Sequence, residues 1–418
     1  MCDFVPGEIM VGYPVDGPGR MIFEEILESA RVGRSLLERD EIIMPMGDEL
    51  PMAFRRVATL PGGEQAAVDD INRLTFEATV RLAQRYHPKS LLDPRQRVFA
   101  QPMHFLRPCH GNAGFGSAQP FRLTPTHFHY LYQIGHPNPR ASEVRPTVAI
   151  IDGGLDVRLC PEDPFHGSVP PAVNLADSSD TSLGQPDAAT THGTLVAKLI
   201  NEVCPEATLL PLRIIGGDGV DNNAVATEWA LFRAVKEAIE AGADIINLSM
   251  RFGINTTKCP TCGDLPREVR TPGFELVVQH AAGSPGRIVV VAAAGNQGIG
   301  QLAFPSRFAS TVAVSAVNSS LQHSYVTNFD HTGRHPLLFA APGGDRGGDA
   351  DEAVAESDDW RYHGTSFAAA YATGTLATIM SLHNVPAGQA VEILNQTSRT
   401  AFAGFDPEYH GRGVIRIV

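Results

Sequence analysis

The feature that most constrains the fold of this chain is a series of apolar runs, alternating with helical patterns, that begins near residue 145. The runs are rich in Val, Ile, Leu and Ala, and they cover Val148–Ile151, Ala207–Ile215, Asp244–Met250, Arg287–Ala293 and Thr311–Val317. Strands of this composition are typical of a parallel sheet that is buried on both faces. We therefore expect an α/β domain with three layers, in which helices cover both faces of a mostly parallel central sheet.

Helical spacing of apolar residues fills the intervals between these runs. It predicts helices over Thr194–Val203, Ala224–Ala241 and Gly273–Ala282. A further segment, Phe367–Met380, contains no charged residue, which predicts a helix that is buried on nearly all sides. Ser366 immediately precedes this segment, so we expect the serine at the N-terminus of a buried helix.

The first 107 residues have a different pattern. A strand is predicted near Val5–Val11, helices over Arg20–Met44 and Gln65–Tyr86, and a second strand over Gln96–Leu106. This combination predicts a small α+β domain over residues 1–107. The glycine-rich sequence that follows predicts a linker over 108–125, and the α/β domain then occupies 126–418.

Composition excludes several classes of partner and compartment. The 418 residues carry a net charge of −13, which argues against nonspecific binding of nucleic acid or of anionic membranes. The N-terminus lacks the basic and apolar regions of a signal peptide, and no apolar run approaches the roughly 18 residues of a membrane span. We expect a cytoplasmic protein whose six cysteines are thiols. The Cys259-x-x-Cys262 pair is read first as a thiol-bearing loop, with a disulfide or a metal clip as the alternatives.

Four polar residues stand at positions suited to nucleophilic catalysis. Asp152 and Asn296 each follow an apolar strand, where ligands of parallel sheets bind. His192 precedes a glycine, and Ser366 stands at the predicted helix N-terminus, where backbone N–H groups favour negative charge. Taken singly, each has a simpler interpretation. Thr365 or Ser366 would be an N-cap, His192 a cap or a packed side chain, and Asp152 and Asn296 turn residues.

The four motifs together resemble those of the subtilisin-like serine proteases, the subtilase family (peptidase S8). The motifs are Asp152-Gly153-Gly154, His192-Gly193-Thr194, Ala292-Ala293-Ala294-Gly295-Asn296 and Gly364-Thr365-Ser366-Phe367-Ala368. Asp, His and Ser follow one another in the chain order of subtilisin. The resemblance extends from about residue 126 to the C-terminus. It implies a serine endopeptidase in which Ser366 is the nucleophile, His192 its base, Asp152 the residue that orients His192, and Asn296 an oxyanion-hole donor.

The resemblance also implies a set of substrate-binding residues. An extended polypeptide would pair with the edge formed by Ser249, Met250, Arg251, Phe252 and Gly253. Ala293, Ala294 and Gly295 would form a wall of the pocket for the residue before the scissile bond. The chemistry requires no cofactor or metal. Structural calcium stays open, because Asp177, Ser178 and Asp180 are rich in oxygen atoms but lack a ligand pattern.

The predicted N-terminal domain resembles subtilase propeptides in its first and last strands. This resemblance implies a zymogen with an intramolecular inhibitor, cleaved within about residues 103–130 because the linker there is flexible. One alternative is an intracellular protease that is held inactive until its N-terminal domain binds a protein activator. Another is a catalytically inert module that binds peptides. The sequence departs from the family pattern at Leu195, Lys198, Phe367 and Ala370, none of which supplies a catalytic atom.

Overall fold

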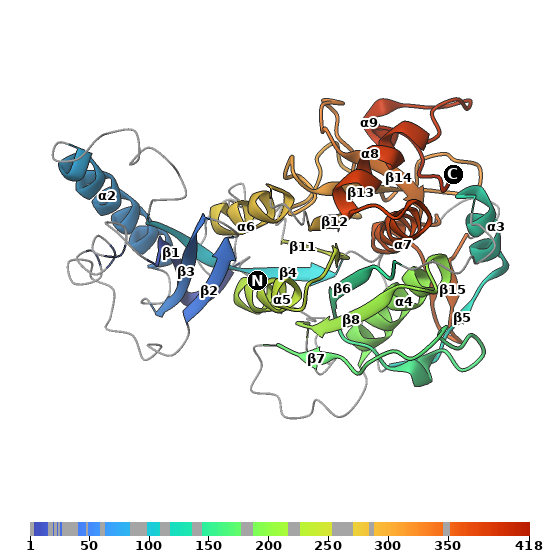
Figure 1. Cartoon of the computed structure of the whole chain (residues 1–418), viewed down its shortest axis with the longest axis horizontal. Helices are drawn as coiled ribbons and strands as arrows, with labels where there is room; N and C mark the ends of the chain where they lie inside the picture. The colour runs from blue at the N-terminus through green and yellow to red at the C-terminus, as the bar shows by residue number, and fades with distance from the viewer. Residues whose placement is uncertain are drawn as a thin grey trace. The chain divides into compact units, whose positions relative to one another are not determined.

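The computed structural model describes residues 4–15, 20, 23, 26, 41–46, 49–58, 63–83, 98–108, 118–135, 144–176, 187–215, 226–252, 271–283, 288–345 and 352–418 (Figure 1). The chain divides into two compact units. The smaller unit comprises residues 1–105, 227–236 and 253–281, and the larger comprises 106–226, 237–252 and 282–418. The predicted boundaries at 107 and 125 stay a prediction.

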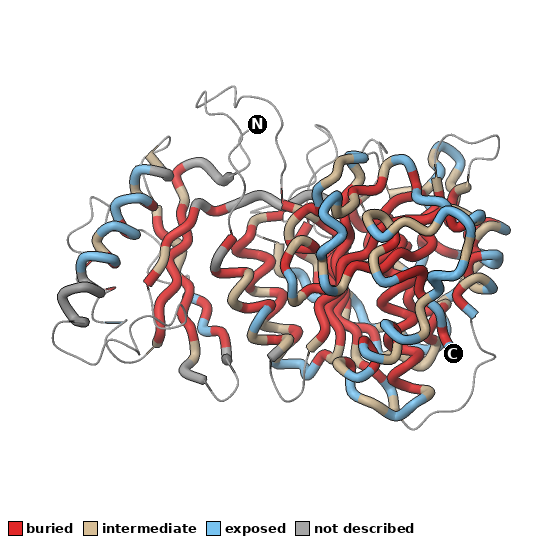
Figure 2. Tube along the Cα trace, turned by 90° about the horizontal axis from the view of Figure 1, so that it is seen from above, coloured by how far each residue is buried: buried red, intermediate tan, exposed pale blue. Residues whose placement is uncertain are grey.

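A seven-stranded parallel sheet forms the centre of the larger unit. Its strand order is β14-β13-β12-β10-β6-β8-β7, and every neighbouring pair is parallel. The strands are β6 (Thr147–Asp152), β7 (Val173–Asn174), β8 (Thr208–Arg213), β10 (Ile245–Leu248), β12 (Val289–Ala293), β13 (Val312–Val317) and β14 (Leu338–Pro342). The trace is almost entirely in the buried colour through the interior strands (Figure 2). The predicted α/β fold with a parallel central sheet is confirmed.

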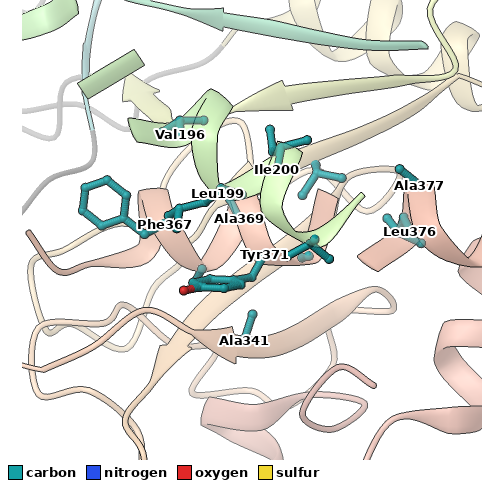
Figure 3. Packing of buried hydrophobic residues seen from close by; sticks show 14 of the residues in the cluster. Val196, Leu199, Ile200, Ala341, Phe367, Ala369, Tyr371, Leu376 and Ala377 are labelled. Atoms are coloured by element: carbon teal, nitrogen blue, oxygen red, sulfur yellow. The ribbon is translucent and has the colours of Figure 1, made fainter. Parts of the chain in front are cut away.

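Two helices pack against each other on this sheet. Helix α4 (Ala188–Val203) lies on β6 and β8, and α7 (Thr365–His383) lies on β10, β12, β13 and β14. Figure 3 shows Val196, Leu199 and Ile200 of α4 beside the α7 segment that carries Phe367, Ala369 and Tyr371. A methyl group at Gly374 of α7 would come within 2.6 Å of the Val203 Cβ, so glycine is needed for this approach. The prediction that the helix after Ser366 is buried on nearly all sides is confirmed, because every residue from Thr365 to Ser381 is buried.

Short elements complete the larger unit. They are β5 (Arg122–Leu123), α3 (Pro125–Gln133), a 3-10 turn (Val157–Leu159), β11 (Met250–Phe252), β15 (Ala355–Glu356), β16 (Arg361–Tyr362), α8 (Ala387–Thr397) and α9 (Pro407–His410). Strand β5 pairs with β15, and Phe121 and Leu123 are buried in the core that contains α4 and α7. Residues 118–125 of the predicted linker are therefore packed against the larger unit.

The smaller unit contains an antiparallel sheet and one long helix. Strand β1 (Phe4–Pro14) pairs with β3 (Glu49–Ala58) on one side and with β4 (Phe99–Pro108) on the other, and β2 (Glu41–Met46) pairs with β3. Helix α2 (Glu64–Ala83) packs on β1 and buries Val68 and Ile71. Three further elements, β9 (Ala226–Thr227), α5 (Glu228–Glu240) and α6 (Pro272–Gly283), lie across the sequence boundaries between the units.

Two predicted elements need correction. The helix predicted over Arg20–Met44 does not reach its predicted end, because Glu41–Met46 forms β2 and is followed by the unpredicted β3. In β2 the buried Ile42 and Met44 alternate with exposed residues, as a strand at a surface requires. The helix predicted from Thr194 begins at Ala188, where Asp187 and Thr190 form a reciprocal capping box. His192 therefore lies inside α4.

Lys198, where the family pattern has glycine, belongs to a buried ion network in the larger unit. Its side chain is 1% exposed, forms an ion pair with Glu202 one turn later in α4, and donates to the Pro164 carbonyl at 2.8 Å. Nε2 of the buried His127 lies 3.9 Å from Glu202 Oε2. Burial alone would raise the pKa of the Glu202 carboxyl, but the contacts with His127 and Lys198 outweigh burial and lower this pKa to about 2.

Replacing Glu202 by glutamine is expected to lower the free energy of unfolding by about 3 kcal/mol at pH 7, because a buried ammonium loses its partner. The folded pKa is below the unfolded value of about 4.3, so the contribution of Glu202 is complete above that pH and is lost as the pH falls toward 2. Urea unfolding of the wild type and E202Q between pH 7 and pH 3 should show the difference shrinking. Glu392→Gln, at an exposed position of α8, is the matched control. An equal loss in both variants would contradict the assignment.

Within the described ranges, no helix combines the length and the apolar character that crossing a membrane requires. Of the cysteines, Cys160 and Cys204 are buried free thiols, and burial raises their pKa values to about 11 and about 12. Cys259 and Cys262 lie outside the described residues.

Candidate active site

The predicted residues gather at the carboxyl edge of the parallel sheet. Asp152 is the last residue of β6, and Asn296 follows three residues after the end of β12. These strands flank β10, so their carboxyl ends open at the same edge. His192 reaches the site from α4, and Ser366 reaches it from the first turn of α7.

Asp152 and His192 form a buried pair. Nδ1 of His192 lies 2.8 Å from Oδ1 of Asp152, and the two side chains are 4% and 1% exposed. The same carboxylate oxygen accepts from the Gly153 N–H at 2.7 Å, which fixes the rotation of the carboxylate. A carboxylate can only accept, so Nδ1 is the protonated nitrogen of a neutral His192. The other ring nitrogen, Nε2, is thereby left as the basic one.

Ser366 lies in the N-terminal turn of a long buried helix. The N-cap is Gly364, so Thr365 and Ser366 are the first two residues of the helix and their N–H groups have no acceptor within it. The Ser366 hydroxyl donates to the Ser249 carbonyl at 3.1 Å. The His192 ring lies 5.6 Å, centroid to centroid, from the ring of Phe367, the next residue after Ser366.

Asn296 is held on the other side of Ser366 by the preceding residue. Its Oδ1 accepts from the Thr365 N–H at 3.0 Å and from the Thr365 hydroxyl at 2.9 Å. These bonds direct Nδ2 the other way, and among the described residues this buried nitrogen has no acceptor. Gly364 has a φ of +133°, and a methyl group there would lie 2.7 Å from Nδ2. A glycine at this position keeps space beside the amide donor.

The described members of the predicted substrate-binding set lie on two segments, one of which contacts Ser366 through Ser249 and the other Thr365 through Gly295. Ser249 joins β10 to β11, and Met250, Arg251 and Phe252 form β11. Gly253 lies outside the described residues. Ala293, Ala294 and Gly295 directly precede Asn296, and the Gly295 N–H donates to the Thr365 hydroxyl at 3.2 Å.

A family model describes this arrangement over most of the chain. The model of the subtilase family matches residues 145–410, a range that contains Asp152, His192, Asn296 and Ser366. This chain belongs to the subtilase family. The resemblance inferred from the four motifs is therefore confirmed.

Two relatives show how distant this subtilase is from well-described members. Subtilisin E of Bacillus subtilis (strain 168) is 27% identical over 296 residues, which cover 65% of this chain and 64% of subtilisin E. The major intracellular serine protease of the same organism is 27% identical over 254 residues, 56% of this chain and 68% of that protein. The chain thus matches less than two thirds of the length of subtilisin E.

Solved structures of similar fold include two proteases. The epidermin leader peptide processing serine protease (EpiP) of Staphylococcus aureus aligns with a TM-score of 0.59 and 16% identity, covering 98% of this chain and 97% of that one. A lanthipeptide protease aligns with a TM-score of 0.50 and 21% identity, covering 70% and 94%. At these identities the likeness shows the subtilase fold alone.

Some contacts of this subtilase site were not anticipated from sequence. The sequence predicts Thr365 only as a possible cap, whereas its hydroxyl and N–H both hold Asn296. Asn247, not singled out in the sequence, donates to the Ser249 hydroxyl at 3.0 Å. The spacing Asn247-x-Ser249 at the end of a strand was the available signal. In the part of the chain that the structure describes, no three His, Cys, Asp or Glu side chains gather as a metal site, and Asp177, Ser178 and Asp180 lie outside it.

Proposed function

We propose that this chain is a serine endopeptidase that hydrolyses polypeptides through an acyl-enzyme on Ser366. The observation that carries the proposal is the buried pair of His192 Nδ1 and Asp152 Oδ1 at 2.8 Å, next to the helix turn that holds Ser366. A buried His–Asp pair of this kind prepares an imidazole to accept a proton on its free nitrogen. A serine hydroxyl is a weak nucleophile until such a base is within reach.

The proposed reaction has two stages. In acylation, Ser366 Oγ attacks the peptide carbonyl, its proton passes to His192 Nε2, and His192 returns that proton to the leaving amine as the C–N bond breaks. In deacylation, water attacks the ester, its proton passes to His192, and Ser366 leaves with that proton to release the acid. Asp152 stabilises the imidazolium that forms in each stage.

Asn296 Nδ2 and the Ser366 N–H are the proposed oxyanion donors. Because Oδ1 of Asn296 is held by Thr365, the amide cannot turn its oxygen toward the developing negative charge without breaking two hydrogen bonds. Asn296→Leu is expected to lower kcat about 10²–10³-fold, the range that follows loss of this donor in subtilisin. KM should change little, since the contact strengthens only in the transition state. A loss confined to KM would contradict the assignment.

The substrate is proposed to add to β11 as an extended strand. Strand β11 is three residues long and its backbone runs directly from Ser249, whose carbonyl accepts from the Ser366 hydroxyl. A peptide that pairs with β11 would therefore pass its own carbonyl groups close to Ser366. Backbone pairing supplies affinity with little dependence on sequence.

We also propose that the N-terminal segment inhibits the enzyme until it is cleaved. Supporting this, the end of β4 pairs antiparallel with β11, with Pro108 opposite Met250, Arg107 opposite Arg251, and Leu106 opposite Phe252. The proposed substrate edge is thus occupied by the chain itself. The sequence directly after Pro108 is the glycine-rich stretch 109–117, which lies within the range of about 103–130 where we expect cleavage.

Mass spectrometry of the purified full chain tests both proposals. Wild type is expected to shorten by a cut within about residues 103–130, and Ser366→Ala is expected to stay at full length. If both proteins stay at full length, self-cleavage is excluded. Reaction of Ser366 with a fluorophosphonate, after an added protease has removed the N-terminal segment, then decides whether the protease proposal survives.

The pairing of β4 with β11 also suits an N-terminal domain that a protein activator displaces without cleavage. This alternative predicts a full-length wild type that becomes reactive only when a partner is added. An inert peptide-binding module predicts no reaction of Ser366 under any condition.

A further inference from the structure

A chain of buried hydrogen bonds connects the nucleophile to the interior of the larger unit. Thr373 Oγ1 lies 2.9 Å from Asn247 Oδ1, Asn247 Nδ2 lies 3.0 Å from Ser249 Oγ, and Ser249 Oγ lies 2.9 Å from the Ser366 carbonyl. Asn247, Ser249 and Thr373 are all 0% exposed. Buried polar groups of this kind are costly unless each one is paired, so the chain has to form as a whole.

The Ser366 carbonyl, at the end of this series of hydrogen bonds, fixes which group donates and which accepts in each of them. The Ser366 carbonyl can only accept, so the Ser249 hydroxyl must donate to it. The Ser249 oxygen must then accept from the amide nitrogen of Asn247, which turns the amide oxygen toward Thr373. Thr373 in turn must donate. One orientation of the amide and of both hydroxyl groups satisfies all three bonds.

The chain begins and ends on the same helix. Thr373 and Ser366 are seven residues apart in α7, about two turns, and therefore face the same side of it. Asn247 lies on β10 and Ser249 follows it. The first turn of α7, whose N–H groups have no acceptor within the helix, is thereby tied to the end of β10.

Ser249 contacts Ser366 twice. Its hydroxyl donates to the Ser366 main-chain carbonyl, and its own main-chain carbonyl accepts from the Ser366 hydroxyl. The residue after Ser249 is the first residue of β11, the proposed substrate edge. One residue therefore fixes both the main chain and the hydroxyl of the nucleophile relative to the strand on which the peptide would lie.

We propose that Asn247, Ser249 and Thr373 are positioning residues that hold Ser366 at its working distance from His192 and Asn296. The proposal rests on the proposed protease function. Losing this chain of hydrogen bonds lets the first turn of α7 shift. A displacement of about 1 Å at a reacting atom lowers the rate on the order of 10²-fold. Substrate affinity depends on β11 itself and is retained.

The test compares two threonines on the same helix. Thr373→Val removes the first donor of the hydrogen-bond chain, and Thr378→Val removes a second buried hydroxyl that donates to the Val203 carbonyl at 2.8 Å, away from Ser366. For Thr373→Val we expect kcat and the second-order rate of Ser366 labelling by a fluorophosphonate to fall about tenfold, with KM within about twofold. Thr378→Val should stay within about twofold of wild type, and Thr373→Ser should restore the rate.

Ser249→Ala should lower the labelling rate further, about ten- to hundredfold, and adding Thr373→Val should cause little extra loss because both act through one chain. The proposal is overturned if Thr373→Val labels as fast as Thr378→Val, if both lose rate in proportion to stability, or if KM rises while kcat holds. If wild type freed of its N-terminal segment by an added protease does not label at all, the protease function itself fails, and this inference fails with it. If wild type is labelled and the variants are labelled at the same rate, only the positioning role is refuted.

Discussion

Ser366→Ala is expected to lower kcat for a peptide substrate by about 10⁶, the size of the loss when a subtilisin nucleophile is removed. The structure places this serine in the first turn of α7, with His192 in contact with the next residue and Asn296 bonded to the preceding one. Among the described residues, Ser366 is the hydroxyl-bearing residue that stands between Thr365, which is bonded to Asn296, and Phe367, whose ring faces His192. The measurement is hydrolysis of a fluorogenic peptide after the N-terminal segment has been removed by an added protease.

Ser381→Ala is the matched control for Ser366→Ala. Ser381 lies in the last part of the same helix and donates to the Val144 carbonyl, remote from the site. It should retain activity within about twofold. The double variant of Ser366 and His192, both to alanine, should be no slower than Ser366→Ala alone, because the two act as one unit. Additive losses would contradict the proposed roles.

Asp152→Asn is expected to lower kcat by about 10⁴ without unfolding the protein. Asparagine has the same shape, but both orientations of its amide fail. With oxygen toward His192 Nδ1 and the Gly153 N–H, both hydrogen bonds persist and the negative charge that stabilises the imidazolium is lost. With nitrogen toward them, the amide faces the Gly153 donor and forces the His192 proton onto Nε2, which can then no longer act as the base.

The control for Asp152→Asn is Asp156→Asn, four residues later. Asp156 caps the short turn at Val157–Leu159 and pairs with Arg158, so its carboxylate serves a different contact. Peptide hydrolysis and thermal unfolding should be measured for both variants. Equal activity of the two variants would remove Asp152 from the mechanism.

The architecture of the larger unit could be predicted because its strands are continuous apolar runs. Val148–Ile151 and Val289–Ala293 are buried, short and rich in β-branched residues, which distinguishes them from a longer buried helix such as the one that contains Phe367–Met380. The strands of the smaller unit were harder to predict from the sequence. Ile42 and Met44 of β2 continue the apolar spacing of the preceding residues, and no glycine or proline separates them from it.

Helix α4 began earlier than predicted because its first turn is made of small residues. Ala188–Thr191 has no apolar periodicity, and the capping box uses threonine at the position where Glu or Gln is the usual signal. The pattern of apolar residues indicates which residues are buried. The start of a helix depends instead on the hydrogen bonds of its cap, which the apolar pattern does not reveal.

Asp152, Asn296 and Ser366 could be found because each stands at or near the end of an element, and His192, inside α4, because it opens a His-Gly-Thr motif. The contacts that hold them could not. Thr373 and Asn247 are bonded across 126 positions, and His127 meets Glu202 across 75. Spacing along the chain carries no information about partners brought together only by the fold.

The central claim is that Ser366 is an activated nucleophile, and reaction with a fluorophosphonate followed by peptide mass spectrometry tests it most directly. The wild-type chain, freed of its N-terminal segment, should carry one adduct on Ser366, and both Ser366→Ala and protein unfolded in urea should carry none. An unmodified Ser366 in folded, cleaved wild type, or an adduct that forms equally well on other serines, would contradict the account.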